Sequence, residues 1–125
     1  MITFKTKTNI DASTFVVLDG QELKQASGST DNIIGISDSI NALSGDVCDV
    51  LEIGTKGQVV AGGTFSAGDA LTADSKGRAI KATTGDNIGA IAYESSTAEN
   101  QIVTVVVALC RTIAQETQNN DTIGG

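Results

Sequence analysis

The side chains that do chemistry in proteins are scarce in this chain, and its two cysteines are the first to consider. The sequence contains no histidine, so no imidazole can activate Cys48 or Cys110, and histidine-based triads and most metal sites are excluded. The two cysteines form no CxxC pair and do not occupy equivalent places in the two halves of the chain. We interpret both as reduced packing residues rather than as a disulfide or as metal ligands.

Carboxylates are the remaining candidates for acid–base or metal chemistry. Asp46, Asp49 and Glu52 alternate with apolar residues along one stretch, which is the pattern of a solvated face of a β-sheet. Three further aspartates, Asp69, Asp74 and Asp86, lie in turn-like segments, where an aspartate side chain caps the local backbone. No loop of the chain has the ligand spacing of a calcium-binding motif. We therefore predict no catalytic residue, no metal site and no cofactor.

The glycines of segment 54–63, GTKGQVVAGG, are the pattern that suggests phosphate binding. The Walker spacing is absent, no Gly-Lys-Ser or Gly-Lys-Thr follows, and no helix is expected to offer its N-terminus to a phosphate. We reject this motif. Because the parts needed for catalysis are missing, the sequence predicts that the protein is not an enzyme.

The composition of the 125 residues excludes further classes of protein. A net charge of −7 with eight scattered basic residues argues against nucleic-acid binding, which needs clustered lysine and arginine. No apolar run is long enough to span a membrane, and the start, MITFKTKT, lacks the apolar stretch of a signal peptide, so we expect synthesis in a cytoplasm. Aromatic residues are 3% of the chain and apolar residues 40%, so the core must be aliphatic.

The elements that would position any site repeat along the chain. A shift of about 55 positions places similar residues of the two halves opposite each other in the same order, with small gaps in turn-like segments. The matches are Ala12 with Ala67, Asp19 with Asp74, 20–24 with 77–81, Gly28 with Gly85, 31–33 with 86–88, Gly35 with Gly89, and 47–51 with 102–106. We infer an internal duplication with copies at 9–54 and 64–109, joined through segment 47–63.

Short strands separated by glycine-rich turns predict an all-β fold. Fourteen glycines and no proline indicate many tight turns, and Asp19-Gly20 is the strongest hairpin signal. The segments expected to contain strands are 14–18, 23–26, 31–38, 47–53, 58–61, 70–73, 78–82, 88–93 and 102–109. Each half alone would be marginally stable, so we expect a compact β-barrel or β-sandwich in which two halves of about 55 residues share one core.

Several local features carry more specific expectations. Glycine inside a strand, at Gly35 and Gly89, predicts a bulge or a close backbone approach. Segment 39–46 fits either one turn of helix or an ordered loop. The run IVTVVVAL at 102–109 is apolar at almost every position, which favours a strand covered on both faces in the middle of the fold.

The two ends of the chain differ from the body. Residues 1–8 alternate apolar and polar side chains, which predicts an edge strand or an extended arm that pairs with the sheet edge of a neighbouring protein. Residues 9–114 are expected to form a single β domain. Residues 115–125, QETQNNDTIGG, are polar and lack any period, which indicates a flexible, disordered tail.

The second half of the chain combines, in this order, an Ala-Gly-Asp segment, apolar positions, an Asp and Gly turn, a short strand, a glycine-containing strand, a polar loop and a valine-rich last strand. The residues are 67–69, 70–71, Asp74 with Gly77, 78–82, 88–93 and 102–107. This series resembles the head decoration, or capsid cement, proteins of tailed bacteriophages, whose members carry these features in the same order. The resemblance extends over about residues 9–109.

The resemblance implies a structural protein of the virion. Such a protein would be made in the host cytoplasm and would bind the outer surface of the expanded capsid, where it bridges neighbouring capsomers. The expected partner is the major capsid protein, with a homotrimer as one form of the bound protein and with no direct contact to nucleic acid or membrane. The alternative is a small β-rich ligand- or receptor-binding module on a virion or cell surface, for which Tyr93 offers a poor aromatic platform.

Contacts with the capsid are expected at two places. The first is the N-terminal segment, which combines strand hydrogen-bonding groups with two cations, and the second is the turn that follows Gly54. The candidate contact residues are Ile2, Phe4, Lys5, Lys7, Thr55 and Lys56.

Overall fold

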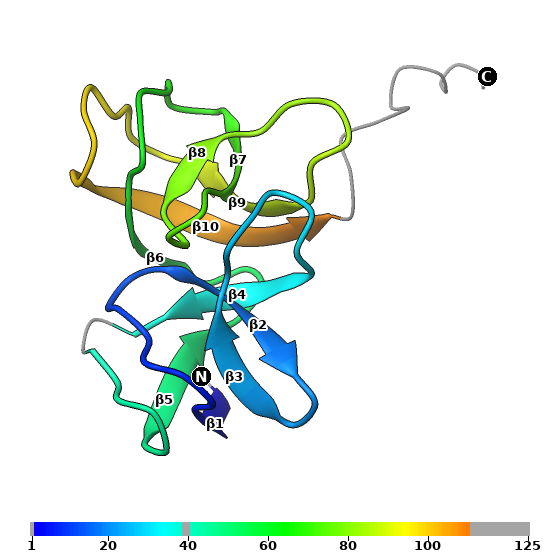
Figure 1. Cartoon of the computed structure of the whole chain (residues 1–125). Coiled ribbons are helices and arrows are strands. Elements are labelled where there is room, and N and C mark those ends of the chain that lie inside the picture. The colour runs from blue at the N-terminus through cyan, green and yellow to red at the C-terminus, as the bar shows by residue number, and fades with distance from the viewer. Residues whose placement is uncertain (1, 39–40, 111–125) are drawn as a thin grey trace.

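The computed structural model describes residues 2–38 and 41–110, with Cys110 described through its backbone only; the predicted C-terminal tail lies outside these residues. In this part of the chain all regular structure is β, as predicted. The strands are β1 (Ile2–Lys5), β2 (Phe15–Asp19), β3 (Glu22–Gln25), β4 (Ile33–Ser37), β5 (Val47–Leu51), β6 (Lys56–Val60), β7 (Ala70–Ala73), β8 (Ala79–Lys81), β9 (Ile88–Ala92) and β10 (Ile102–Cys110). They form two five-stranded antiparallel sheets, one above the other in Figure 1.

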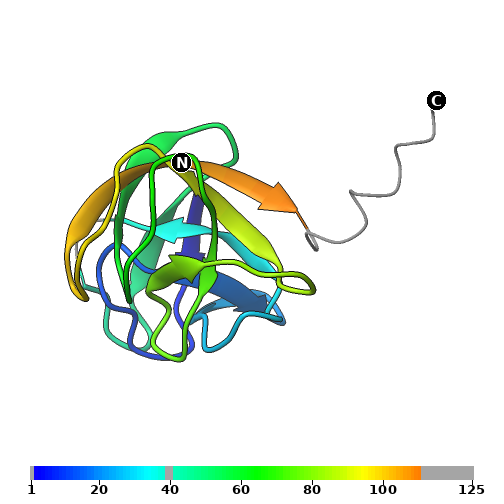
Figure 2. The same ribbon diagram turned by 90° about the horizontal axis from the view of Figure 1, so that it is seen from above.

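The two sheets have the same topology. The strand order is β1-β5-β4-β2-β3 in the first sheet and β6-β10-β9-β7-β8 in the second. In each sheet the two outer strands approach each other at one isolated parallel bridge, Thr6 with Leu23 and Ala61 with Ala79. Each sheet is therefore a curved, partly closed barrel, and β10 follows this curvature around the second one (Figure 2). The fold is thus two small curved sheets packed together rather than one barrel.

Hydrogen bonds outside the strands also repeat at the predicted offset. The main-chain bonds of the first unit recur in the second at positions about 55 residues later, with similar lengths. The matched donor and acceptor pairs are Thr6→Asp46 and Ala61→Gln101, Lys7→Leu23 and Gly62→Ala79, Ile10→Ala42 and Phe65→Ser96, Gly45→Thr6 and Asn100→Ala61, and Asp38→Asp49 and Tyr93→Thr104. The two halves therefore share backbone conformation as well as strand order.

The structural units begin earlier than the sequence matches suggested. β1 and β6 occupy the same edge position of their sheets, so the N-terminal segment belongs to the first unit and Lys56–Val60 opens the second. The sequence limits of 9–54 and 64–109 leave out these two strands because their residues share little: ITFK stands opposite GQVV. Residues 2–5 form an edge strand paired with β5 rather than an extended arm.

One hydrophobic core joins the two units. Phe15, Ile33 and Ile36 from the first sheet pack in the same cluster as the interior residues of the second, among them Leu71 and Val105. A smaller cluster lies on the other side of the first sheet and includes Val16, Leu23 and Val50. The core is almost wholly aliphatic, as the scarcity of aromatic residues predicted. The first sheet is therefore covered on both faces, by the smaller cluster within its own unit and by the shared core on the side of the second unit.

The strand glycines mark close approaches, as predicted. A Cβ atom at Gly35 would lie 2.4 Å from the carbonyl oxygen of Leu51, and the pairing of β2 with β4 shifts register beside it. A Cβ atom at Gly89 would lie 2.6 Å from Cε1 of Phe15, so this glycine admits the ring that links the two units. Larger residues at either position would push the packed elements apart.

Two expectations need correction or completion. β10 is the second strand of its sheet and not the middle one, and its residues alternate between buried and partly exposed, so the prediction of coverage on both faces was wrong. In segment 39–46, residues 41–46 contain no helix; Ala42 instead forms an antiparallel bridge with Ile10.

Candidate functional site

Among residues 2–38 and 41–110 no group of three or more His, Cys, Asp or Glu side chains could hold a metal ion. Cys48 is a free, buried cysteine on β5, within the smaller core cluster. Burial is the main cause that raises the pKa of the Cys48 thiol above its ordinary value of 9.0, and the neighbouring charges of Asp49 and Asp38 act in the same direction. At neutral pH the thiol is therefore uncharged and weakly nucleophilic. Cys110 has no described side chain.

We expect Cys48 to react slowly with thiol reagents in the folded protein. In a Cys110→Ser variant, the rate of modification by a disulfide reagent at neutral pH should be about tenfold or more below that of the same variant in denaturant, because both thiolate content and access are reduced. The release of the coloured thiolate measures the rate. Equal rates in the two conditions would mean that Cys48 is exposed and that its packing role is wrong.

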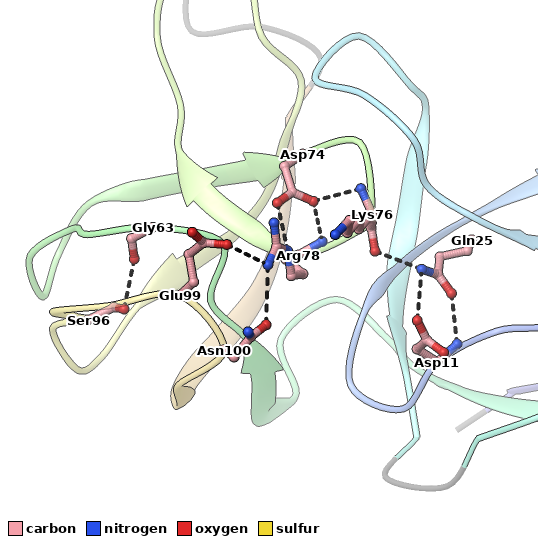
Figure 3. Close-up of polar contacts among 9 residues, drawn as sticks. All are labelled: Asp11, Gln25, Gly63, Asp74, Lys76, Arg78, Ser96, Glu99 and Asn100. Carbon is pink, nitrogen blue, oxygen red and sulfur yellow. Dashed lines mark hydrogen bonds and ion pairs between the residues drawn. The ribbon is translucent and has the colours of Figure 1, made fainter.

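A polar pocket of about 270 Å³ lies where the two units meet. It is lined by Asp11, Ala12, Thr14, Val60, Lys76, Arg78, Glu99 and Asn100. Figure 3 shows that the Arg78 guanidinium points toward Asp74, Glu99 and Asn100. The Nε atom lies 2.9 Å from the Asp74 carboxylate, and Nη1 lies 2.9 Å from Glu99 and 3.2 Å from the side-chain oxygen of Asn100.

These contacts make the pocket a structural joint between the two units. The hydrogen bond to Glu99 is the main cause that raises the pKa of Arg78, with Asp74 as a further cause, so the charge of the guanidinium is already compensated. Beside it the Gln25 side chain donates to the Lys76 carbonyl at 2.7 Å and accepts from the Asp11 N–H at 2.7 Å, which ties the first unit to the second (Figure 3).

A second, open pocket of about 550 Å³ is lined mostly by hydroxyl-bearing residues of the second unit: Thr64, Phe65, Ser66, Asp69, Lys81, Ser95, Ser96 and Thr97. Its polar groups are engaged in local turns. The Asp69 carboxylate accepts from the Ser66 N–H at 2.9 Å, and the Ser96 hydroxyl donates to the Gly63 carbonyl at 2.8 Å. These hydrogen bonds are those of ordered loops, and Phe65, the aromatic residue that lines the pocket, is buried.

The first group of predicted contact residues lies on and just after the edge strand β1. Ile2 and Lys5 are exposed, whereas Phe4 points inward and packs against the smaller core cluster. The Lys7 ammonium forms an exposed ion pair with Asp19 at 3.1 Å. Of these four side chains, Ile2 and Lys5 are thus the ones most available to a partner.

The second group lies at the start of β6, the equivalent edge of the other sheet. Thr55 is half-buried, with its N–H donating to the Glu52 carbonyl and its carbonyl accepting from the Val107 N–H. Lys56 is exposed, and its Nζ atom lies 5.5 Å from the centre of the Tyr93 ring. The two predicted groups therefore belong to different sheets rather than to one cluster, and sequence reasoning missed that they occupy equivalent edges.

Comparison with known proteins assigns this all-β chain to a family. The model of the phage cement protein family matches residues 1–109, which include every strand of the first unit and nearly all of the second. The chain belongs to the phage cement protein family. The resemblance seen in its sequence is confirmed, and the protein is a structural component of the phage virion that associates with the capsid.

A solved structure shows the same fold. The crystal structure of the N base of head fiber gp8.5 in bacteriophage phi29 matches with a TM-score of 0.67 and 24% sequence identity, over 89% of this chain and 93% of that chain. At this identity the likeness establishes the fold. No curated protein matches the sequence. In the described residues no helix is long and apolar enough to cross a membrane.

Proposed function

We propose that this cement protein binds the outer surface of the expanded phage capsid and stabilises it by bridging neighbouring capsomers. The observation that carries the proposal is the family match over residues 1–109, the part of the chain that forms the two packed units. The partner is the major capsid protein, and the bound form is a monomer or a homotrimer. The protein is made in the host cytoplasm and acts on the exterior of the shell.

The duplicated architecture suits a bridging role. The edge strands β1 and β6 occupy the same place in their sheets, and each carries an exposed lysine, Lys5 on β1 and Lys56 on β6, so a single rigid molecule presents two equivalent edges. An edge strand can pair with an extended segment of another protein, and a second contact on the same molecule becomes effectively intramolecular. Two modest contacts can then hold two neighbouring capsomers together.

Thermodynamic linkage supplies the stabilisation. A protein that binds the expanded lattice and not the unexpanded one shifts the shell toward the expanded state by mass action. Each bound copy adds its own contribution, so many copies stabilise the shell strongly even when each binds weakly. The shared core of the two units keeps the distance between the two edges fixed, which a bridging protein requires.

The deciding experiment is co-sedimentation of the purified protein with expanded phage heads that lack their own decoration layer, with unexpanded proheads as the control. We expect saturable binding to expanded heads at a fixed number of copies per capsomer and little binding to proheads. A folded protein that sediments with neither form would contradict the proposal.

Point variants test the two edges in the same assay. Deleting residues 1–8 is unsuitable because it removes β1, which pairs with β5 and meets β3 at the bridge of Thr6 with Leu23. Lys5→Gln and Lys56→Gln should each weaken binding about two- to fivefold through loss of one exposed charge contact. Lys81→Gln, an exposed lysine on another strand, is the matched control and should leave binding unchanged. Equal effects at all three positions would exclude the two edges as specific contacts.

A further inference from the structure

We propose that the outer face of the second unit formed by Val60, Tyr93, Ile102 and Thr104, the Tyr93 face, is the surface that docks on the capsid protein. This inference rests on the proposed function and assigns its contact surface. The partner surface has an apolar side chain over Tyr93 and Ile102 and a carboxylate beside Lys56.

Strand register places these side chains together. Ile102 of β10 is directly opposite Val60 of β6, and Tyr93, which follows β9, donates its N–H to the Thr104 carbonyl at 2.9 Å. Ile102 is 51% exposed and Tyr93 54% exposed, although each has a large apolar side chain. The face lies on the strands β6, β10 and β9 of the upper sheet in Figure 1.

The first unit shows that the fold does not require an apolar surface here. Because the two units share register and hydrogen bonds, the pair Val60 and Ile102 corresponds to Lys5 and Val47, and the pair Tyr93 and Thr104 corresponds to Asp38 and Asp49. Three of these four backbone positions thus carry charged residues in the first unit, where Val47 is the exposed apolar exception, and all four carry uncharged, mostly apolar residues in the second. A contiguous exposed apolar patch that the fold does not require indicates a protein interface.

Charge favours a capsid subunit over a second copy of this chain as the occupant. The chain carries a net charge of −7, so two copies repel each other as they approach. At the edge of the Tyr93 face lies Lys56, whose contact among the described residues is the Tyr93 ring and not a carboxylate. A partner carboxylate would complete this contact. Lys56 also begins the β6 edge, so the face adjoins one of the two edges proposed above.

The test replaces residues of the face by their counterparts from the first unit. A Val60→Lys/Tyr93→Asp double variant carries the residues found at Lys5 and Asp38, at backbone positions that already accept them in this fold. The control is the single variant Asp49→Thr in the first unit, which places the residue type of Thr104 at its counterpart there. We expect the double variant to bind expanded heads about 30-fold more weakly than the wild type, as for a central interface residue. The control should bind expanded heads as well as the wild type does.

Circular dichroism and thermal unfolding verify that each variant is folded, and the exposed single variant Tyr93→Ser serves if the double variant unfolds. Undiminished binding of a folded double variant, with binding by the wild type intact, would overturn the Tyr93 face and leave the proposed function standing. A wild type that does not bind would overturn the proposed function, and the assignment of the face with it. If the double variant binds as well as the wild type but loses self-association in light scattering, the occupant is a second copy and the inference is wrong.

Discussion

Replacing Phe15 by alanine should lower the free energy of unfolding by about 3–5 kcal/mol, the cost of removing a fully buried aromatic ring from a core. Phe15 has no exposed surface and lies at the start of β2, where its side chain joins the cluster that contains the interior of the second sheet. Its ring lies against Gly89 of the other unit. The loss is a large fraction of the about 5–15 kcal/mol that stabilises a typical domain, so the variant should be only marginally folded.

Urea unfolding followed by circular dichroism measures this loss. Phe4→Ala is the matched control, since Phe4 is half-buried on the edge strand β1 and packs against the smaller cluster of one unit. We expect the control to lose clearly less stability, and we expect one cooperative transition for the wild type because the units share a core. A larger loss for Phe4→Ala than for Phe15→Ala would show that the packing between the units contributes little.

The turns of the two units should respond differently to the same substitution. Gly77→Ala should destabilise the protein by about 2–4 kcal/mol, whereas Gly20→Ala should cost about 1–2 kcal/mol. Both glycines have a positive φ, +75° at Gly77 and +68° at Gly20, so alanine is strained in either turn. A Cβ at Gly77 would lie 2.9 Å from Cγ of Gln25 and 3.2 Å from the Phe15 carbonyl oxygen, while one at Gly20 meets nothing within 4 Å.

The difference between these two variants isolates the packing between the units. Thermal and urea unfolding of the two proteins, measured side by side, give the excess cost at Gly77, which we expect to be about 1–2 kcal/mol. Gly77 also accepts the Phe15 N–H through its carbonyl at 2.8 Å, so a shifted turn would weaken that bond as well. Equal losses of stability for the two variants would mean that the turn at Gly77 does not pack tightly against the first unit.

Local sequence signals predicted most of the strands. β-branched residues between turn residues marked β2, β5, β7, β9 and β10 within a few positions, because strand propensity and glycine turns act over a few residues. The signal failed for β10 in a specific way: its apolar run indicated a strand buried on both faces, yet the outer residues are partly exposed. An apolar run in the sequence predicts that its side chains are buried. It does not distinguish burial inside this fold from burial against another protein.

The candidate contact residues show the same limit. The sequence singled out Phe4 and Lys56 as neighbours of a partner, but Phe4 faces the core and Lys56 lies against Tyr93. A side chain's direction at a sheet edge depends on register, and a shift by one residue reverses it. Tyr93 follows β9 and Ile102 begins β10, nine positions later, so their common face appears only when β9 and β10 are paired.

By itself the sequence determined the β class, the aliphatic core, the repeat and the family, because composition, local propensity and ordered matches are properties of the chain alone. Only the tertiary structure decided that β1 and β6 are equivalent edge strands and that the two units share one core through Phe15 and Gly89. It also decided which residues of the two units occupy equivalent surface positions and therefore where the units differ in charge. These features depend on contacts between residues distant in the chain. Such contacts form only when strands pair in one register and their buried faces meet.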